Sequence, residues 1–84
     1  MIPVRCELDK RLSSFARADD WPDKLPCRPI IGDFIYTAQK HRYGWPRAKV
    51  SEVSITESEV IITLSPECDD LEEAKEKYLS FFGD

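Results

Sequence analysis

The residues most suited to binding chemistry lie in the segment 40–49. Within ten residues, this segment combines cations with two large aromatic rings, those of Tyr43 and Trp45. Cations hold phosphates or carboxylates, while aromatic rings stack on bases or fill pockets of a protein partner. The segment is therefore predicted to be a partner-binding loop between strands, carried by Lys40, His41, Arg42, Tyr43, Trp45, Arg47 and Lys49. In the alternative interpretation, both rings fold back into the core and the cations are solvated around them.

Thiol chemistry is a second arrangement to weigh. Cys6, Cys27 and Cys68 with His41 would suit a tetrahedral zinc ion, but structural zinc ligands come in close pairs and these four are far apart in the chain. Cys68 with His41 as its base could form a nucleophile. The carboxylates on either side of Cys68 oppose formation of the thiolate. No metal site and no catalytic residue are predicted.

Two pairs of adjacent carboxylates, at residues 19–20 and 69–70, could in principle serve acid–base catalysis. Doubled carboxylates in such positions usually cap helices or shape turns. No glycine-rich phosphate loop accompanies them, since the chain has only three glycines. The sequence therefore predicts no cofactor and no enzymatic activity.

Length and composition predict one small domain over residues 1–84. Hydrophobic residues make up 42% and charged residues 33% of the chain, as in ordinary globular proteins. No apolar stretch approaches the roughly 18 residues that a membrane span needs, and the first ten residues lack the apolar run of a signal peptide. The three cysteines are odd in number and contain no Cys-x-x-Cys pair. These features predict a cytoplasmic protein with reduced thiols and no membrane contact.

A β-hairpin is the clearest structural pattern and spans residues 50–64. Apolar residues alternate on both sides of a turn at 56–59, and one extra residue near Ser51 brings the last pair into register. The pattern predicts a β-bulge at that point. The predicted cross-strand neighbours on the core side are Ile55 with Val60, Val53 with Ile62 and, beyond the bulge, Val50 with Leu64.

Local patterns predict the other elements. Alternation predicts a strand over 2–8, in which Pro3 favours an edge position. Asp9 is expected to cap a short helix over 9–18. The motif Ser65-Pro66-Glu67 is typical of a helix start and predicts a helix over 66–82 that ends at Gly83. Its apolar positions include Leu71 and Tyr78, which are expected to cover the hairpin. A further strand is predicted over 34–38.

Together these elements predict an α+β fold with a small, mostly antiparallel sheet of about four strands and a C-terminal helix packed on it. The motif Gly32-Asp33-Phe34-Ile35, followed by Val50 and Val53, resembles the way small SH3-like barrels begin a strand after a turn. The resemblance implies a partly open SH3-like barrel as the form of this sheet.

Charge is divided unevenly along the chain. Residues 1–50 carry ten Lys and Arg against six Asp and Glu, a net charge of +4, whereas residues 51–84 carry two against ten, a net charge of −8. Such asymmetry marks a basic and an acidic face, or two halves that neutralise each other. The sequence favours a non-enzymatic interaction domain that acts by protein–protein contact. The alternatives are a nucleic-acid binder that uses the loop 40–49 and an acidic inhibitor that presents the helix 66–82 to a basic surface.

Overall fold

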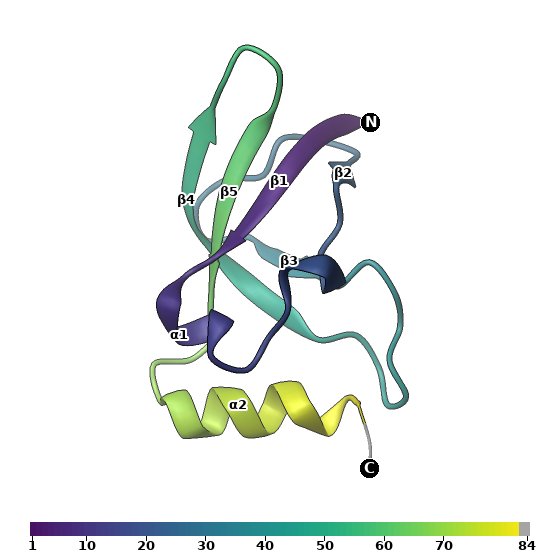
Figure 1. The fold of residues 1–84 in the computed structure, drawn as a ribbon, viewed down its shortest axis with the longest axis vertical. Coiled ribbons are helices and arrows are strands. Elements are labelled where there is room, and N and C mark those ends of the chain that lie inside the picture. The colour runs from purple at the N-terminus through teal and green to yellow at the C-terminus, as the bar shows by residue number, and fades with distance from the viewer. Residues whose placement is uncertain (83–84) are drawn as a thin grey trace.

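Five short strands curl into a half-barrel, and a C-terminal helix lies across one end of it (Figure 1). The computed structural model describes residues 1–82. The strands are β1 (Ile2–Leu8), β2 (Lys24–Leu25), β3 (Phe34–Tyr36), β4 (Arg47–Ile55) and β5 (Val60–Ser65), in the sheet order β2-β1-β5-β4-β3. The helices are α1 (Lys10–Ser13), the 3-10 turn η1 (Ala18–Asp20) and α2 (Leu71–Ser80). The predicted α+β fold class is confirmed, with five strands in place of about four, and the curled half-barrel is consistent with the SH3-like form.

The sheet is mixed, because β1 runs parallel to β5 and every other pair is antiparallel. The edge position predicted for β1 is wrong: β1 lies between β2 and β5. Proline has no backbone N–H to donate to a neighbouring strand. Pro3 is tolerated in β1 because the pairing with β5 begins only at Val4, so no hydrogen bond to β5 is lost.

The β4–β5 hairpin has the predicted register. Val53 lies opposite Ile62, Ile55 lies opposite Val60, and the shift between Val50 and Glu52 is the predicted bulge. The turn closes with a bond of 2.9 Å from the amide of Thr56 to the carbonyl of Glu59. Alternation of apolar side chains was therefore enough to fix the pairing of this hairpin.

At the tip of the hairpin, the burial predicted for Val60 is confirmed and that predicted for Ile55 is wrong. Ile55 is 62% exposed, although Ile62 is fully buried. The tip extends beyond the other strands in Figure 1, so Ile55 has no layer above it to pack against. Leu71, which was expected to cover the hairpin, is also exposed.

The predicted helix over 66–82 begins too early. β5 continues to Ser65, which pairs with Lys49 and donates a hydrogen bond from its hydroxyl to the Lys49 carbonyl at 3.4 Å. The helix cap is instead Asp70, whose Oδ1 accepts from the amides of Glu72 and Glu73 at 3.0 and 3.2 Å. Strand pairing thus overrides a favourable local start signal, and the helix α2 runs from Leu71 to Ser80. The predicted stop at Gly83 lies outside the described residues.

Local signals were more successful in two short elements. The Asp9 carboxylate accepts from the Leu12 amide at 2.9 Å, as expected of the cap of α1. This helix is shorter than predicted because the hydroxyls of Ser13 and Ser14 bond back to backbone carbonyls of the preceding turn. Gly32 adopts a φ of 100°, which allows the turn before β3, and β3 ends at Tyr36 rather than at residue 38.

Tyr78 attaches α2 to the rest of the domain. Its ring packs within 5.4 Å of Phe15, 6.4 Å of Trp21 and 5.0 Å of Phe82, measured between ring centroids. Its hydroxyl donates to Asp20 Oδ2 at 3.0 Å. Burial, together with the hydrogen bond and charge of Asp20, raises the pKa of Tyr78 above its usual 10.0. One side chain therefore joins α2 to η1 and to the segment that follows α1.

We predict that Ile62→Ala lowers the free energy of unfolding by about 2–5 kcal/mol, because it leaves a cavity in a fully buried site. The matched variant Ile55→Ala, in the same hairpin, should change it by less than about 0.5 kcal/mol because its side chain is exposed. Urea unfolding monitored by circular dichroism measures both. Equal losses for the two variants would contradict the burial of the hairpin described above.

Candidate functional site

One outer face of the domain gathers aromatic and cationic side chains from β3 and β4. Phe34 lies opposite Lys49 and Tyr36 lies opposite Arg47 in the antiparallel register, so these four side chains share one side of the sheet. Ile35, between the two rings, points into the core. Trp45 lies directly before β4. We call this surface, together with the exposed loop that precedes β4, the basic-aromatic face. Its residues are Phe34, Tyr36, Arg47 and Lys49 on the sheet and Lys40, Arg42, Tyr43 and Trp45 in the loop.

The structure places all but one of the predicted binding residues at the surface. Lys40, Arg42, Tyr43, Trp45, Arg47 and Lys49 are exposed, while His41 is half-buried. The prediction that all of them lie in one loop is wrong for Arg47 and Lys49, which belong to β4. The loop between β3 and β4 covers residues 37–46. In Figure 1 it extends to the C-terminal end of α2.

Contacts with the end of α2 hold this loop in place. The ring of His41 stacks on Phe82 at 4.1 Å between centroids, and the amide of Tyr43 donates to the Phe81 carbonyl at 2.9 Å. His41 also pairs with Gly44 across a tight turn. Gly44 has a φ of 137°, and a Cβ built there would lie 3.0 Å from the Phe81 ring. Only glycine fits this close approach without displacing its neighbour.

Arg47 is the most constrained cation of the face. Its Nε donates to Glu67 Oε2 at 2.8 Å, and its guanidinium carbon lies 4.2 Å from the centre of the Phe34 ring. The bond to Glu67, with a further contribution from the Tyr36 hydroxyl, raises the pKa of Arg47. Glu67 also accepts from Lys77 Nζ at 3.4 Å. The bond to Glu67 thus holds the edge of the guanidinium, and the contact with Phe34 orients its plane.

Glu67 carries its charge in spite of being half-buried. Burial pushes the pKa of this carboxyl up, but the hydrogen bond and charge of Arg47, with help from Lys77, outweigh it and leave the pKa below its usual value of 4.5. A cleft of 440 Å³ opens beside this ion pair. Three aromatic rings, those of Tyr36, Trp45 and Phe81, line it together with the ion pair.

Sequence reasoning missed several of these residues. Phe34 and Tyr36 alternate with a buried Ile35, and this alternation within a predicted strand was a signal that could have placed both rings on the outer face. Glu67 and Phe81 lie 20 or more positions from Arg47 and Trp45 along the chain. No local pattern indicates contacts at such a separation.

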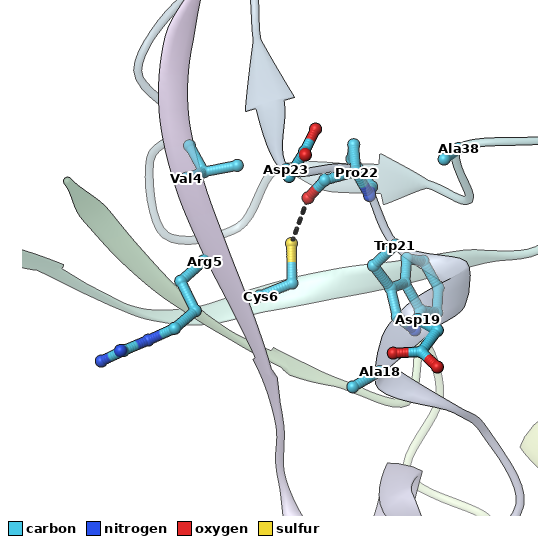
Figure 2. A pocket seen from close by; sticks show the side chains of 9 residues that line it. All are labelled: Val4, Arg5, Cys6, Ala18, Asp19, Trp21, Pro22, Asp23 and Ala38. Carbon is cyan, nitrogen blue, oxygen red and sulfur yellow. Dashed lines mark hydrogen bonds between the residues drawn. The ribbon is translucent and has the colours of Figure 1, made fainter.

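A larger hollow of 520 Å³ lies beside β1 and holds one of the cysteines (Figure 2). The Cys6 thiol donates to the Pro22 carbonyl at 3.3 Å, and burial raises the pKa of Cys6 to about 11. Arg5 extends away from the hollow in this view and forms ion pairs with Glu7 and Glu59 at 3.6 and 3.3 Å. Cys6 is therefore protonated at neutral pH and packed as a small apolar residue.

The other candidates for chemistry occupy separate places. Partial burial and the charge of Glu73 raise the pKa of Cys68, and its thiol lies 3.6 Å from the Asp70 carbonyl. The three cysteines are all free, and Cys27 is exposed. Within residues 1–82, no group of three or more His, Cys, Asp or Glu side chains is arranged to hold a metal ion. The doubled carboxylates serve structure, through the Asp20 bond to α2 and the Asp70 cap.

Comparisons with known proteins do not assign the chain to a family. No protein-family model matches its sequence, and neither curated proteins nor solved structures gave a match. None of the helices within residues 1–82 combines the length and the apolar character that crossing a membrane requires.

We predict that Gly44→Ala destabilises the domain more than Gly32→Ala. Both glycines have a positive φ, which costs an alanine about 1–2 kcal/mol. Only Gly44 lies against a ring, so its variant should lose about 1 kcal/mol more through displacement of Phe81. Urea unfolding curves measure the difference. The anchoring of the loop on α2 would be contradicted by a Gly44→Ala variant as stable as Gly32→Ala.

Proposed function

We propose that this domain is a non-enzymatic interaction module that binds another protein through the basic-aromatic face. The observation that carries the proposal is the exposure of three aromatic rings around one side of the sheet, with a fourth in the loop that precedes β4. Phe34, Tyr36, Tyr43 and Trp45 are each at least 41% exposed. Aromatic rings bury large areas at interfaces, and contiguous apolar patches on a protein surface mark contact sites.

The rings and cations of this face are held in place before any partner binds. Arg47 lies over Phe34 and is bonded to Glu67, while Arg42 lies 5.3 Å from the centre of the Tyr43 ring. Side chains that are already ordered lose less conformational entropy on binding. This order supports a binding role for the face.

The charge of the face indicates an acidic partner. Lys40, Arg42 and Lys49 form no ion pair with any of the residues 1–82. Unpaired cations around an apolar surface attract a partner of opposite charge and speed its association. The basic half of the chain thus contributes the contact surface, although the protein as a whole carries a net charge of −4.

Nucleic acid is the second candidate partner. Exposed rings between cations could stack on bases while the cations contact phosphates. The position of Glu67 disfavours this alternative, because its carboxylate lies within the face and would repel a phosphate backbone. The salt dependence of binding distinguishes the two partners, since phosphate contacts weaken steeply as salt is added.

The acidic-inhibitor alternative receives less support from the same contacts. Within the region predicted to present negative charge, Glu67 and Glu73 already lie within 4.0 Å of Lys77. Carboxylates that are partly neutralised within their own chain attract a basic surface less strongly.

The absence of enzymatic activity and a cytoplasmic location form part of the same proposal. The pKa values of Cys6 and Cys68 are both raised, which keeps these thiols protonated near neutral pH and unsuited to act as nucleophiles. Free, unpaired cysteines are typical of a reducing compartment. Both features support a protein that acts by contact.

We predict that immobilised wild-type domain captures a protein partner from a nuclease-treated extract of its host, and that Trp45→Ala reduces the recovery by about tenfold or more. The double variant Arg42→Glu with Lys49→Glu should also lose the partner, because it reverses two unpaired charges. Ile55→Ala serves as the matched control, since it removes an exposed apolar side chain at the other end of β4. Quantitative mass spectrometry measures the recovered protein.

Thermal melting of each variant distinguishes loss of binding from loss of folding. Trp45→Ala should retain its Tm, because its ring is exposed rather than part of the core. Capture that persists in both face variants would show the face to be structural. Capture that nuclease treatment abolishes would assign the face to nucleic acid instead.

A further inference from the structure

The cleft beside Trp45 has the lining of a site for an apolar side chain and space for the residues next to it. It measures 440 Å³ and lies where Trp45 and Tyr36, on the sheet side, face Phe81 at the end of α2. Aromatic walls favour an apolar or aromatic group, which gains by leaving water. The cleft adjoins the basic-aromatic face, with which it shares Tyr36, Trp45 and Arg47.

At the rim of the cleft, Arg47 is arranged to accept an anion. Its bond to Glu67 uses Nε, and the terminal nitrogens carry four N–H donors, more than the contact with the Tyr36 hydroxyl needs. Donors therefore remain for a second acceptor. The Phe34 ring beneath the guanidinium fixes its plane. A guanidinium oriented in this way can hold a carboxylate through two parallel bonds.

The balance of charge at the cleft also favours an anion. Glu67 and, at 4.0 Å from Lys77, Glu73 balance the charges of Arg47 and Lys77. The unpaired positive charge beside the cleft is therefore that of Lys49, which lies on the same side of β4 as Arg47. The loop that precedes β4 adds two more exposed cations, Lys40 and Arg42.

We infer that the cleft binds an acidic segment of a protein partner: an apolar side chain enters between Trp45, Tyr36 and Phe81, and a neighbouring Asp or Glu carboxylate binds Arg47. This inference rests on the proposed function and adds the chemistry of the partner to it. The apolar residue supplies burial in the cleft, and the carboxylate fixes the direction of the segment.

Protein is favoured over nucleic acid at this position for two reasons. The lining places Glu67 next to Arg47, where a lone carboxylate can be accommodated at the terminal nitrogens but a chain of phosphates would meet repulsion. In addition, a cleft between three aromatic rings suits the branched or aromatic side chain of a protein, whereas bases stack on open platforms of rings.

The test is a selection of binding peptides from a displayed library of random dodecapeptides on the intact domain. The selected peptides should share an apolar residue flanked by Asp or Glu. A synthetic peptide made from the selected sequence is then titrated into the domain, and its matched analogue carries Asn and Gln in place of Asp and Glu. We predict that the analogue binds about tenfold more weakly, because it loses charge-assisted bonds.

Variants of the domain identify the group that binds the carboxylate. Arg47→Ala should weaken the acidic peptide about tenfold, and Arg47→Lys should weaken it nearly as much, because lysine keeps the charge but loses the planar fork. Arg28→Ala, which removes an exposed arginine outside the face, is the control. NMR should show the indole N–H signal of Trp45 shifting with peptide while that of the buried Trp21 stays in place.

Several results would overturn the inference. These are selected peptides that lack carboxylates, an analogue that binds as well as the acidic peptide, or binding that survives Arg47→Ala. A library that yields no peptide with a preference for wild-type domain over Trp45→Ala would do the same. Displacement of the peptide by a lower concentration of oligothymidylate would assign the cleft to nucleic acid. If no acidic peptide binds the cleft but capture of a protein partner still depends on Trp45, this inference is wrong and the proposed function is unaffected.

Discussion

The docking of α2 through Tyr78 is the interaction on which the candidate site depends. Tyr78 holds the helix against Phe15 and Trp21, and its hydroxyl is bonded to Asp20. The end of the helix then supports the loop 37–46 through Phe82 and the Phe81 carbonyl. A small core therefore determines the shape of the contact surface, because the residues that line the cleft come from the sheet and from the helix that Tyr78 attaches.

Much of the fold could be predicted because its determinants are local. The hairpin register and its bulge follow from alternating apolar residues, and the cap at Asp9 follows from one side chain. The helix start at Ser65 failed because pairing with Lys49 stabilises that residue in a strand, and this competition is not visible in a short window. The parallel pairing of β1 with β5 was missed for the same reason, since it joins the two ends of the chain.

The candidate site could be predicted only in part. Composition identified residues 40–49, because cations and rings are concentrated there whatever the fold. The partners that give the site its form come from elsewhere: Phe34 stacks under Arg47, Glu67 orients it, and Phe81 closes the cleft. Sequence patterns indicate which residues are suited to binding, whereas the cleft itself arises from packing between distant segments.

Hydrogen exchange at the Tyr43 amide tests this dependence most directly. That amide donates to the Phe81 carbonyl at the end of α2, so the account predicts slow exchange in the wild-type domain. Tyr78→Phe, which removes the bond to Asp20, should accelerate exchange at Tyr43 and at the α2 amides by a similar factor. Rapid exchange at Tyr43 while α2 stays protected, or a Tyr78→Phe effect confined to the helix, would contradict the claim that the docked helix holds the contact surface in place.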